Sequence, residues 1–242
     1  MKNSQTKKAG LVAIAIGFFI LFSFVSPVLT GQTIKETRDV PQFSGITLAF
    51  SGNVYVTQGS PQQVVIEADK NTMDKIVTEI NGDKLVLKTR DGHWRDLGKI
   101  SVYITMPDVE LLAVTGSGDL ICESPIKTNE MELFVSGSGS VKVSRLEAHE
   151  VSAEITGSGD IMLAGSSNEG EMDATITGSG SIKAQDFEVS EASVRITGSG
   201  SAMVYATKEL ETNITGSGSV NYKGKPLINA TATGSGKTRS MN

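Results

Sequence analysis

The chain has 242 residues, with 22 Lys and Arg against 27 Asp and Glu, two His, one Cys and one Trp. This length suits one or two domains with a sizeable core, and a single Cys excludes an internal disulfide framework. The aliphatic content excludes disorder, and the 26 glycines lack the three-residue period of collagen. Residues 1–30 hold three Lys and no acid, so the remainder has 19 basic and 27 acidic residues, a net charge of −8. That balance disfavours nucleic acid and anionic membranes as partners of the folded part.

The first thirty residues have the features of an export segment. Lys2, Lys7 and Lys8 precede an uncharged, largely apolar run over residues 9–29, which is long enough to span a bilayer. Pro27 would end a helix early, which is typical of a signal peptide, whereas no A-x-A cleavage site follows. Residues 1–30 are therefore predicted to be a signal peptide or an N-terminal signal anchor. The positive flank places the chain from about residue 30 onward outside the cytoplasm.

Residues 31–107 read as an irregular cap followed by degenerate first rungs of a repeat. Strands are expected around the Ser-Gly pairs of residues 43–56 and over residues 64–67, 84–88 and 100–106, where apolar and polar residues alternate. A short helix is expected over residues 71–77, with Asn71 as its N-cap. Terminal repeats of solenoids are commonly atypical because they must close the core.

One segment of this cap, residues 90–96, is a candidate partner-binding site. It holds His93, Trp94 and Arg95, including the only Trp of the chain. An exposed Trp beside Arg residues could stack on a sugar or on a partner side chain. The alternative is local packing of this Trp over the edge of the cap.

Residues 108–242 contain a repeat of about twenty residues. The tetrapeptide Thr/Ser-Gly-Ser-Gly begins at positions 115, 136, 156, 177, 197, 215 and 233, at spacings of 21, 20, 21, 20, 18 and 18 residues. Before each copy apolar and polar residues alternate, as in Ala174, Thr175 and Ile176, and the alternation resumes after it, as in Ile182 and Ala184. A period of two predicts a strand with one side inward, so each repeat reads as strand, Gly-Ser-Gly corner, strand.

A repeat of this size cannot bury its apolar side alone, but stacked copies form one continuous core. The sequence therefore predicts an all-β fold, a β-solenoid of the right-handed β-helix type, in which residues 31–242 form a single domain. Two glycines at each corner are expected to allow backbone angles and stacking that other residues would prevent. These are Gly116, Gly118, Gly137, Gly139, Gly157, Gly159, Gly178, Gly180, Gly198, Gly200, Gly216 and Gly218. A weaker apolar position predicts a third side at Ile126, Leu146, Phe187 and Leu210.

No cofactor, metal site or catalytic set is predicted. Asp119 and Asp160 directly follow their corners, and Ser140 occupies the equivalent position in the repeat between them. This alternation is expected of a solvated surface and not of a calcium-binding site. Polysaccharide lyases and hydrolases need convergent carboxylates, whereas the outward charged residues are scattered along the chain. Cys122 occupies an inward position, as a buried, inert thiol does.

The ensemble of motifs resembles the head GIN domain family of auto-transporter adhesins, a bacterial family, over about residues 36–220. The resemblance rests on Phe43-Ser44-Gly45-Ile46, on the stretch from Val54 to Gly59, on Leu85-Val86-Leu87, on the stretch from Ile104 to Pro107, and on Thr115-Gly116-Ser117-Gly118-Asp119 with its later copies. It implies an exported β-helical protein of Gram-negative bacteria, in the periplasm, at the outer membrane or on the cell surface. The family offers no catalytic residues to carry over.

The first functional hypothesis is an exported envelope module, adhesin-like or structural, that binds a glycan or an envelope protein and has no catalytic activity. The alternative is a carbohydrate-active enzyme on a β-helix scaffold. No nucleic-acid partner is expected, and contact with a membrane is expected only through residues 9–29, if they remain attached. The last rungs are short and weakly apolar, so the domain is predicted to be mainly monomeric.

Overall fold

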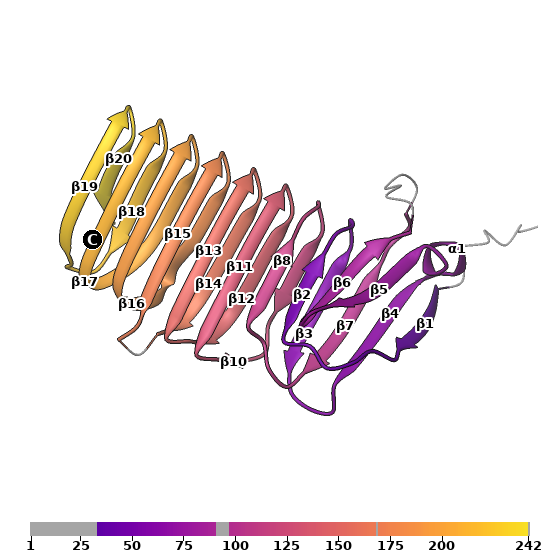
Figure 1. The fold of residues 1–242 in the computed structure, drawn as a ribbon. Helices are drawn as coiled ribbons and strands as arrows, with labels where there is room; N and C mark the ends of the chain where they lie inside the picture. The colour runs from indigo at the N-terminus through magenta and orange to yellow at the C-terminus, as the bar shows by residue number, and fades with distance from the viewer. Residues whose placement is uncertain (1–32, 91–96, 168, 242) are drawn as a thin grey trace, which may run out of the picture. The chain divides into compact units, whose positions relative to one another are not determined.

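The computed structural model describes residues 33–90, 97–167 and 169–241, which form a β-solenoid (Figure 1). Each rung consists of two strands joined by a corner, and equivalent strands of successive rungs pair in parallel. Side chains alternate between the interior and the surface, and the inward apolar residues form one continuous core. The prediction of an all-β solenoid with rungs of about twenty residues is confirmed.

The strands form two faces, which we call face 1 and face 2. Face 1 consists, in stacking order, of β5 (Ile76–Asn81), β6 (Lys84–Thr89), β2 (Gly45–Leu48), β8 (Leu111–Val114), β11 (Glu130–Gly137), β13 (Glu150–Gly157), β15 (Glu171–Gly178), the second halves of β16 (Ser181–Gly198) and β17 (Ser201–Gly216), and β19 (Leu227–Gly234). Face 2 consists of β1 (Thr33–Arg38), β4 (Gln63–Asp69), β7 (Ser101–Met106), β3 (Asn53–Gln58), β9 (Asp119–Cys122), β12 (Ser140–Glu147), β14 (Asp160–Ser166), the first halves of β16 and β17, β18 (Ser219–Lys223) and β20 (Lys237–Ser240).

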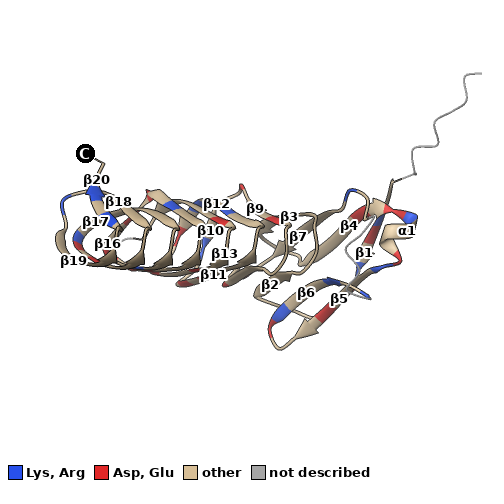
Figure 2. Ribbon diagram, turned by 90° about the horizontal axis from the view of Figure 1, so that it is seen from above, with Lys and Arg blue, Asp and Glu red and all other residues tan. Residues whose placement is uncertain are grey.

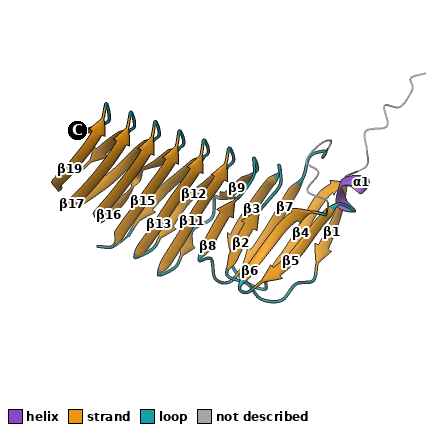
Figure 3. Ribbon diagram, turned by 45° about the horizontal axis from the view of Figure 1, so that its top comes forward, coloured by secondary structure: helices purple, strands orange, loops and turns teal. Residues whose placement is uncertain are grey.

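The corners lie in a row along one edge of the stack (Figure 3). The backbone ladder continues through them, since the Ser158 amide donates to the Gly137 carbonyl (2.9 Å) and the Ser199 amide to the Gly178 carbonyl (2.9 Å). The first glycine of six corners has a positive φ, for example +123° at Gly178. The second glycine lies against the rung before it, so each of these six corners requires glycine at both positions, for different reasons.

The first corner differs from the others. Gly116 does not have a positive φ, and a Cβ there would meet its nearest neighbours at 3.7 Å, an ordinary contact. A Cβ on Gly118, by contrast, would lie only 2.5 Å from the Phe50 carbonyl oxygen. Glycine is therefore needed at Gly118 but not at Gly116.

A short third side is present in part of the stack. The strand β10 (Ile126–Lys127) pairs with Leu146 and Glu147, and the column continues through Gly165 to Phe187. The next rung omits this side, because the register passes directly from Ala184–Val204 to Glu188–Tyr205. This omission explains the shortening of the repeat to 18 residues.

The assignment of Leu210 to the third side is wrong. Leu210 pairs with Ala192 and Ile228 on face 1, where its side chain is buried. Along the chain, Leu210 precedes its corner by the same number of residues as Ala192 does, whereas Phe187 lies further from its corner. Because this rung lacks the third side, comparing it with the longer rungs placed Leu210 wrongly at the position of Phe187.

The N-terminal part combines rungs with an antiparallel cap. The strands β1, β4 and β5 pair antiparallel to their neighbours, with β4 beside β7 and β5 beside β6. The pair β2–β3 lies between β6–β7 and β8–β9, so the rungs here do not follow chain order (Figure 1).

The expected helix over residues 71–77 is a single turn, α1 (Lys70–Met73). Its N-cap is Asp69 and not Asn71: the Asp69 carboxylate accepts hydrogen bonds from the Thr72 amide (2.9 Å) and the Thr72 hydroxyl (2.6 Å). Val77 instead belongs to β5, opposite Lys88 in the β5–β6 hairpin. Pairing of this β-branched residue in a sheet overrides the local helical pattern.

Candidate functional site

Face 1 carries a ladder of glutamates on its outer surface. Glu130, Glu150, Glu171, Glu191 and Glu209 occupy the same position in five successive rungs and pair directly in register. All five are exposed, and none forms an ion pair among the described residues. Like charges one rung apart, about 4.8 Å, repel each other. The outer surface of face 1 is therefore strongly acidic.

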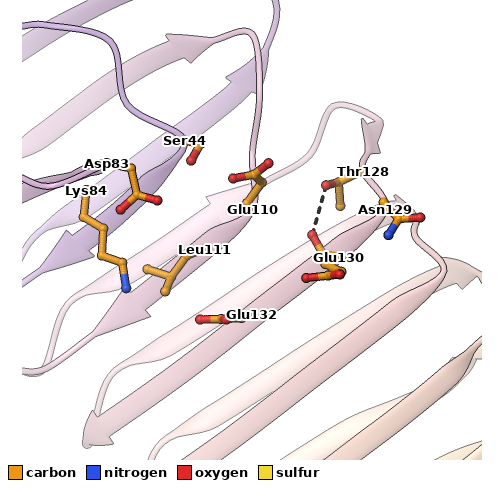
Figure 4. A pocket seen from close by; sticks show the side chains of 9 residues that line it. All are labelled: Ser44, Asp83, Lys84, Glu110, Leu111, Thr128, Asn129, Glu130 and Glu132. Atoms are coloured by element: carbon orange, nitrogen blue, oxygen red, sulfur yellow. Dashed lines mark hydrogen bonds between the residues drawn. The ribbon is translucent and has the colours of Figure 1, made fainter.

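Two shallow hollows lie on this acidic surface. One, of about 350 Å³, lies where the cap meets the regular rungs and is bordered by Asp83, Glu110, Glu130 and Glu132 together with Lys84 (Figure 4). Figure 4 shows these side chains spread over several strands and the segments before them, and not directed at one point. The other, of about 160 Å³, follows the later glutamates of the ladder. Among residues 33–90, 97–167 and 169–241, no three His, Cys, Asp or Glu side chains are placed to hold a metal ion.

Face 2 has a different outer surface, with a column of aromatic and long aliphatic side chains. The rings of Tyr103 and Tyr55 stack with centroids 5.3 Å apart and an interplanar angle of 15°. The Lys35 ammonium lies 5.7 Å from the centroid of Tyr103, whose side chain is 42 % exposed. In register, the column continues through Ile121, Lys142, Met162, Lys183 and Met203. We call these seven residues, from Tyr103 to Met203, the face 2 stripe.

A polar column runs beside the face 2 stripe, one rung after another. The Ser140 hydroxyl donates to the Asp119 carboxylate (2.6 Å), and the Lys183 ammonium pairs with the Asp160 carboxylate (3.1 Å). Hydroxyl groups of Ser181 and Ser201 follow, 3.3 Å apart. The aspartates thus have hydroxyl and ammonium partners, and the stripe offers apolar surface with hydrogen-bonding groups along its length.

The sequence-predicted candidates fall in different places. His93, Trp94 and Arg95 lie outside the described residues. Cys122 is fully buried, and burial raises the pKa of its thiol to about 12, so it is protonated at physiological pH. Glu154 lies on face 1, away from the Asp119 column on face 2.

Neither the glutamate ladder nor the face 2 stripe was recognised in the sequence. Both repeat with the period of the rungs. Comparing the side chains down every outward column of the repeat would have found them.

The fold and its outer surfaces define the class of protein: a β-solenoid whose exposed side chains form columns along two faces, acidic on one and aromatic and aliphatic on the other. The chain belongs to the family described as putative auto-transporter adhesin, head GIN domain, whose model matches residues 42–226. No curated protein is significantly similar to the chain.

Solved structures of similar proteins share the fold. A putative adhesin from Bacteroides fragilis is 24 % identical with a TM-score of 0.82, over 87 % of this chain and 97 % of that one. A putative lipid binding protein from Parabacteroides distasonis is 26 % identical with a TM-score of 0.69, over 88 % and 98 %. A putative adhesin from Parabacteroides merdae is 23 % identical with a TM-score of 0.70, over 88 % and 98 %.

Among the described residues, no helix is long and apolar enough to cross a membrane. Residues 9–29, the apolar run of the expected export segment, lie outside the described part of the chain.

Proposed function

We propose that this protein is an exported, non-catalytic adhesin-like module, and that the face 2 stripe is its contact surface for an extended glycan. The observation that carries the proposal is the stripe itself: the stacked Tyr103 and Tyr55 rings continue in register through Ile121 and Met162 to Met203. Membership in a family of auto-transporter adhesin heads supports a location outside the cell or at its surface.

The chemistry of the stripe suits a sugar chain. Tyrosine at a surface offers apolar ring atoms together with a hydroxyl group. The aliphatic stems of Lys142 and Lys183 add apolar surface, and the Lys183 ammonium is held by the Asp160 carboxylate. The adjoining serine hydroxyls can exchange hydrogen bonds with sugar hydroxyls. Contacts repeat at about 4.8 Å per rung, so a linear partner can lie along several rungs at once.

Face 1 is less suited to this role. Its outer surface carries the glutamate ladder, which has no basic partner among the described residues. This ladder would repel acidic glycans and offers little apolar surface to neutral ones. The hollow beside the cap does not direct its carboxylates at one point, as glycoside hydrolysis requires (Figure 4). We therefore propose binding without turnover.

Binding of the full chain to an array of bacterial polysaccharides tests the proposal, with Tyr103→Ala and Met162→Ser as stripe variants and Glu150→Ala on face 1 as the matched control. Each lost contact should weaken binding roughly tenfold, in line with loss of about 1–2 kcal/mol of buried contact. The control should bind as the unchanged protein does. Equal binding by all variants, or release of new reducing ends from the polysaccharide, would overturn the proposal.

A further inference from the structure

The rung that contains β19 and β20 has an unusual combination of charge and exposed apolar surface. Residues 212–242 contain Lys223, Lys225, Lys237 and Arg239 but no Asp or Glu, although the chain beyond residue 30 has a net charge of −8. Figure 2 shows Lys and Arg gathered around β18 and β20. The four large hydrophobic side chains that are exposed in the described residues are Tyr103, Leu227, Ile228 and Met241. Three of the four therefore lie in this one rung or directly after it.

These residues gather at one edge. The beginning of β19 and the end of β20 both lie opposite the Gly-Ser-Gly corner (Figure 1). Leu227 is 79 % exposed and Ile228 46 %, and Met241, 42 % exposed, follows β20 and donates its amide to the Tyr222 carbonyl (2.8 Å). We define the C-terminal edge patch as Lys223, Lys225, Leu227, Ile228, Arg239 and Met241.

The cations of the patch have no carboxylate partners in the described part of the chain. Lys223 lies over the ring of Tyr205, 4.6 Å from its centroid, and Lys225 and Arg239 form no ion pair among the described residues. On the neighbouring rung the glutamate ladder ends at Glu209, whose register partner is Leu227. At this position the outer surface changes from acidic to apolar and basic within one rung.

We propose that the C-terminal edge patch docks on the surface of an anionic phospholipid bilayer. Exposed Leu, Ile and Met side chains can enter the boundary between headgroups and acyl chains, while Lys and Arg pair with the phosphates. A second copy docking through the same patch would bring two uncompensated sets of cations together, which disfavours that occupant. The net negative charge of the folded part disfavours anionic membranes, but the acidic residues lie outside residues 212–242, so the patch itself is basic.

The patch is separate from the face 2 stripe, which ends at Met203, although Arg239 follows Asn221 further along the same column. The two surfaces would hold the solenoid between a membrane and a glycan. Loss of one activity should therefore leave the other unchanged.

A fluorescent probe at the patch tests the proposal in the full chain, where residues 9–29 would complicate a simple co-sedimentation assay. Leu227→Cys is labelled with an environment-sensitive dye, and Thr175→Cys on face 1 carries the same dye as a control; the buried Cys122 stays unlabelled. The probes are vesicles of phosphatidylcholine alone and of phosphatidylcholine with phosphatidylglycerol. We expect a blue-shifted, brighter signal only for the dye at position 227 and only with the anionic vesicles.

Charge variants complete the test. Lys225→Gln with Arg239→Gln should lower partitioning to anionic vesicles roughly 25-fold, since each cation near such a surface contributes about fivefold. Lys88→Gln with Arg195→Gln removes the same charge from face 1, outside both the patch and the face 2 stripe, and should have little effect. Equal loss in both pairs, an equal signal in both vesicle types, or a signal that rises with protein concentration without vesicles would overturn the proposal. Circular dichroism establishes that each variant is folded.

Discussion

Alanine substitutions at the corner glycines separate backbone strain from steric overlap. At Gly178 the φ of +123° is unfavourable for any residue with a Cβ, and that Cβ would also collide with the Gly157 carbonyl of the rung before. At Gly180 a Cβ would lie 2.5 Å from the Gly159 carbonyl oxygen and 2.6 Å from Cγ2 of Ile155. Both neighbours belong to the stacked core, so neither can move without disturbing its own rung.

The expected magnitudes follow from these two terms. Overlap alone at Gly180→Ala should cost about 1–3 kcal/mol of unfolding free energy, as overpacking in a core does. Gly178→Ala adds a backbone cost of about 1–3 kcal/mol, so the sum is roughly 2–6 kcal/mol. These are large fractions of the roughly 5–15 kcal/mol that stabilises a typical domain.

Three other positions serve as controls. Gly82 has a φ of +64° but open space around it, so Gly82→Ala should show the backbone cost alone, about 1–2 kcal/mol. Gly116→Ala meets ordinary contacts at 3.7 Å and should change stability by less than about 0.5 kcal/mol. Thr175→Val replaces a half-exposed, outward residue on β15 and should be tolerated or slightly stabilising.

Urea denaturation followed by circular dichroism measures these differences. Repeat proteins can unfold in steps, so thermal midpoints should accompany the urea curves where a transition is broad. The expected order of loss is Gly178→Ala, then Gly180→Ala, then Gly82→Ala, with Gly116→Ala near zero. If Gly116→Ala costs as much as Gly178→Ala, or if Gly180→Ala is silent, the account of the corners is refuted.

Three further predictions concern single side chains. Glu171→Gln should raise stability by about 0.2–1 kcal/mol by relieving repulsion from Glu150 and Glu191, and high salt should shrink this gain; a loss of stability would contradict it. The Cys122 thiol should resist thiol reagents in the folded protein, because burial raises its pKa to about 12, and should react once urea unfolds the chain; rapid native labelling would show that the interior is open. Hydrogen bonds from Thr72 lower the pKa of Asp69 below its ordinary 3.8, so its contribution to stability is complete above that value and is lost as the pH falls through the lower, folded pKa. Asp69→Ala should remove this part of the acid sensitivity, seen as a smaller difference in urea midpoint between neutral pH and pH below about 3, and an unchanged difference would contradict it.

The regular rungs could be predicted because residues at equivalent positions of the repeat are also the residues that pair between stacked strands. The corner tetrapeptides align Thr156, Thr177, Thr197 and Thr215, and the structure pairs the same residues in register. Once the corners are aligned, the period-two alternation decides which residues point inward. Leu210 was misplaced only where the repeat loses a side.

The cap and the candidate surfaces could not be predicted in the same way. Nothing in the local sequence of β2 and β3 says that they insert between β6–β7 and β8–β9, because that placement depends on contacts far apart in the chain. The helix expected near Asn71 gave way to the pairing of β5 with β6. The Tyr103–Tyr55 stack likewise depends on a register that joins residues 48 positions apart.

Hydroxyl-radical footprinting of the full chain, with and without a polysaccharide that it retains, tests the central claim most directly. The face 2 stripe contains side chains that such radicals modify readily, Tyr55, Tyr103, Met162 and Met203, while Phe134 on face 1 and Met241 report on other surfaces. The account predicts that bound polysaccharide protects the four stripe residues, leaves Phe134 and Met241 unchanged, and remains intact. Protection centred on Phe134, uniform protection of all six residues, or cleavage of the polysaccharide would contradict it.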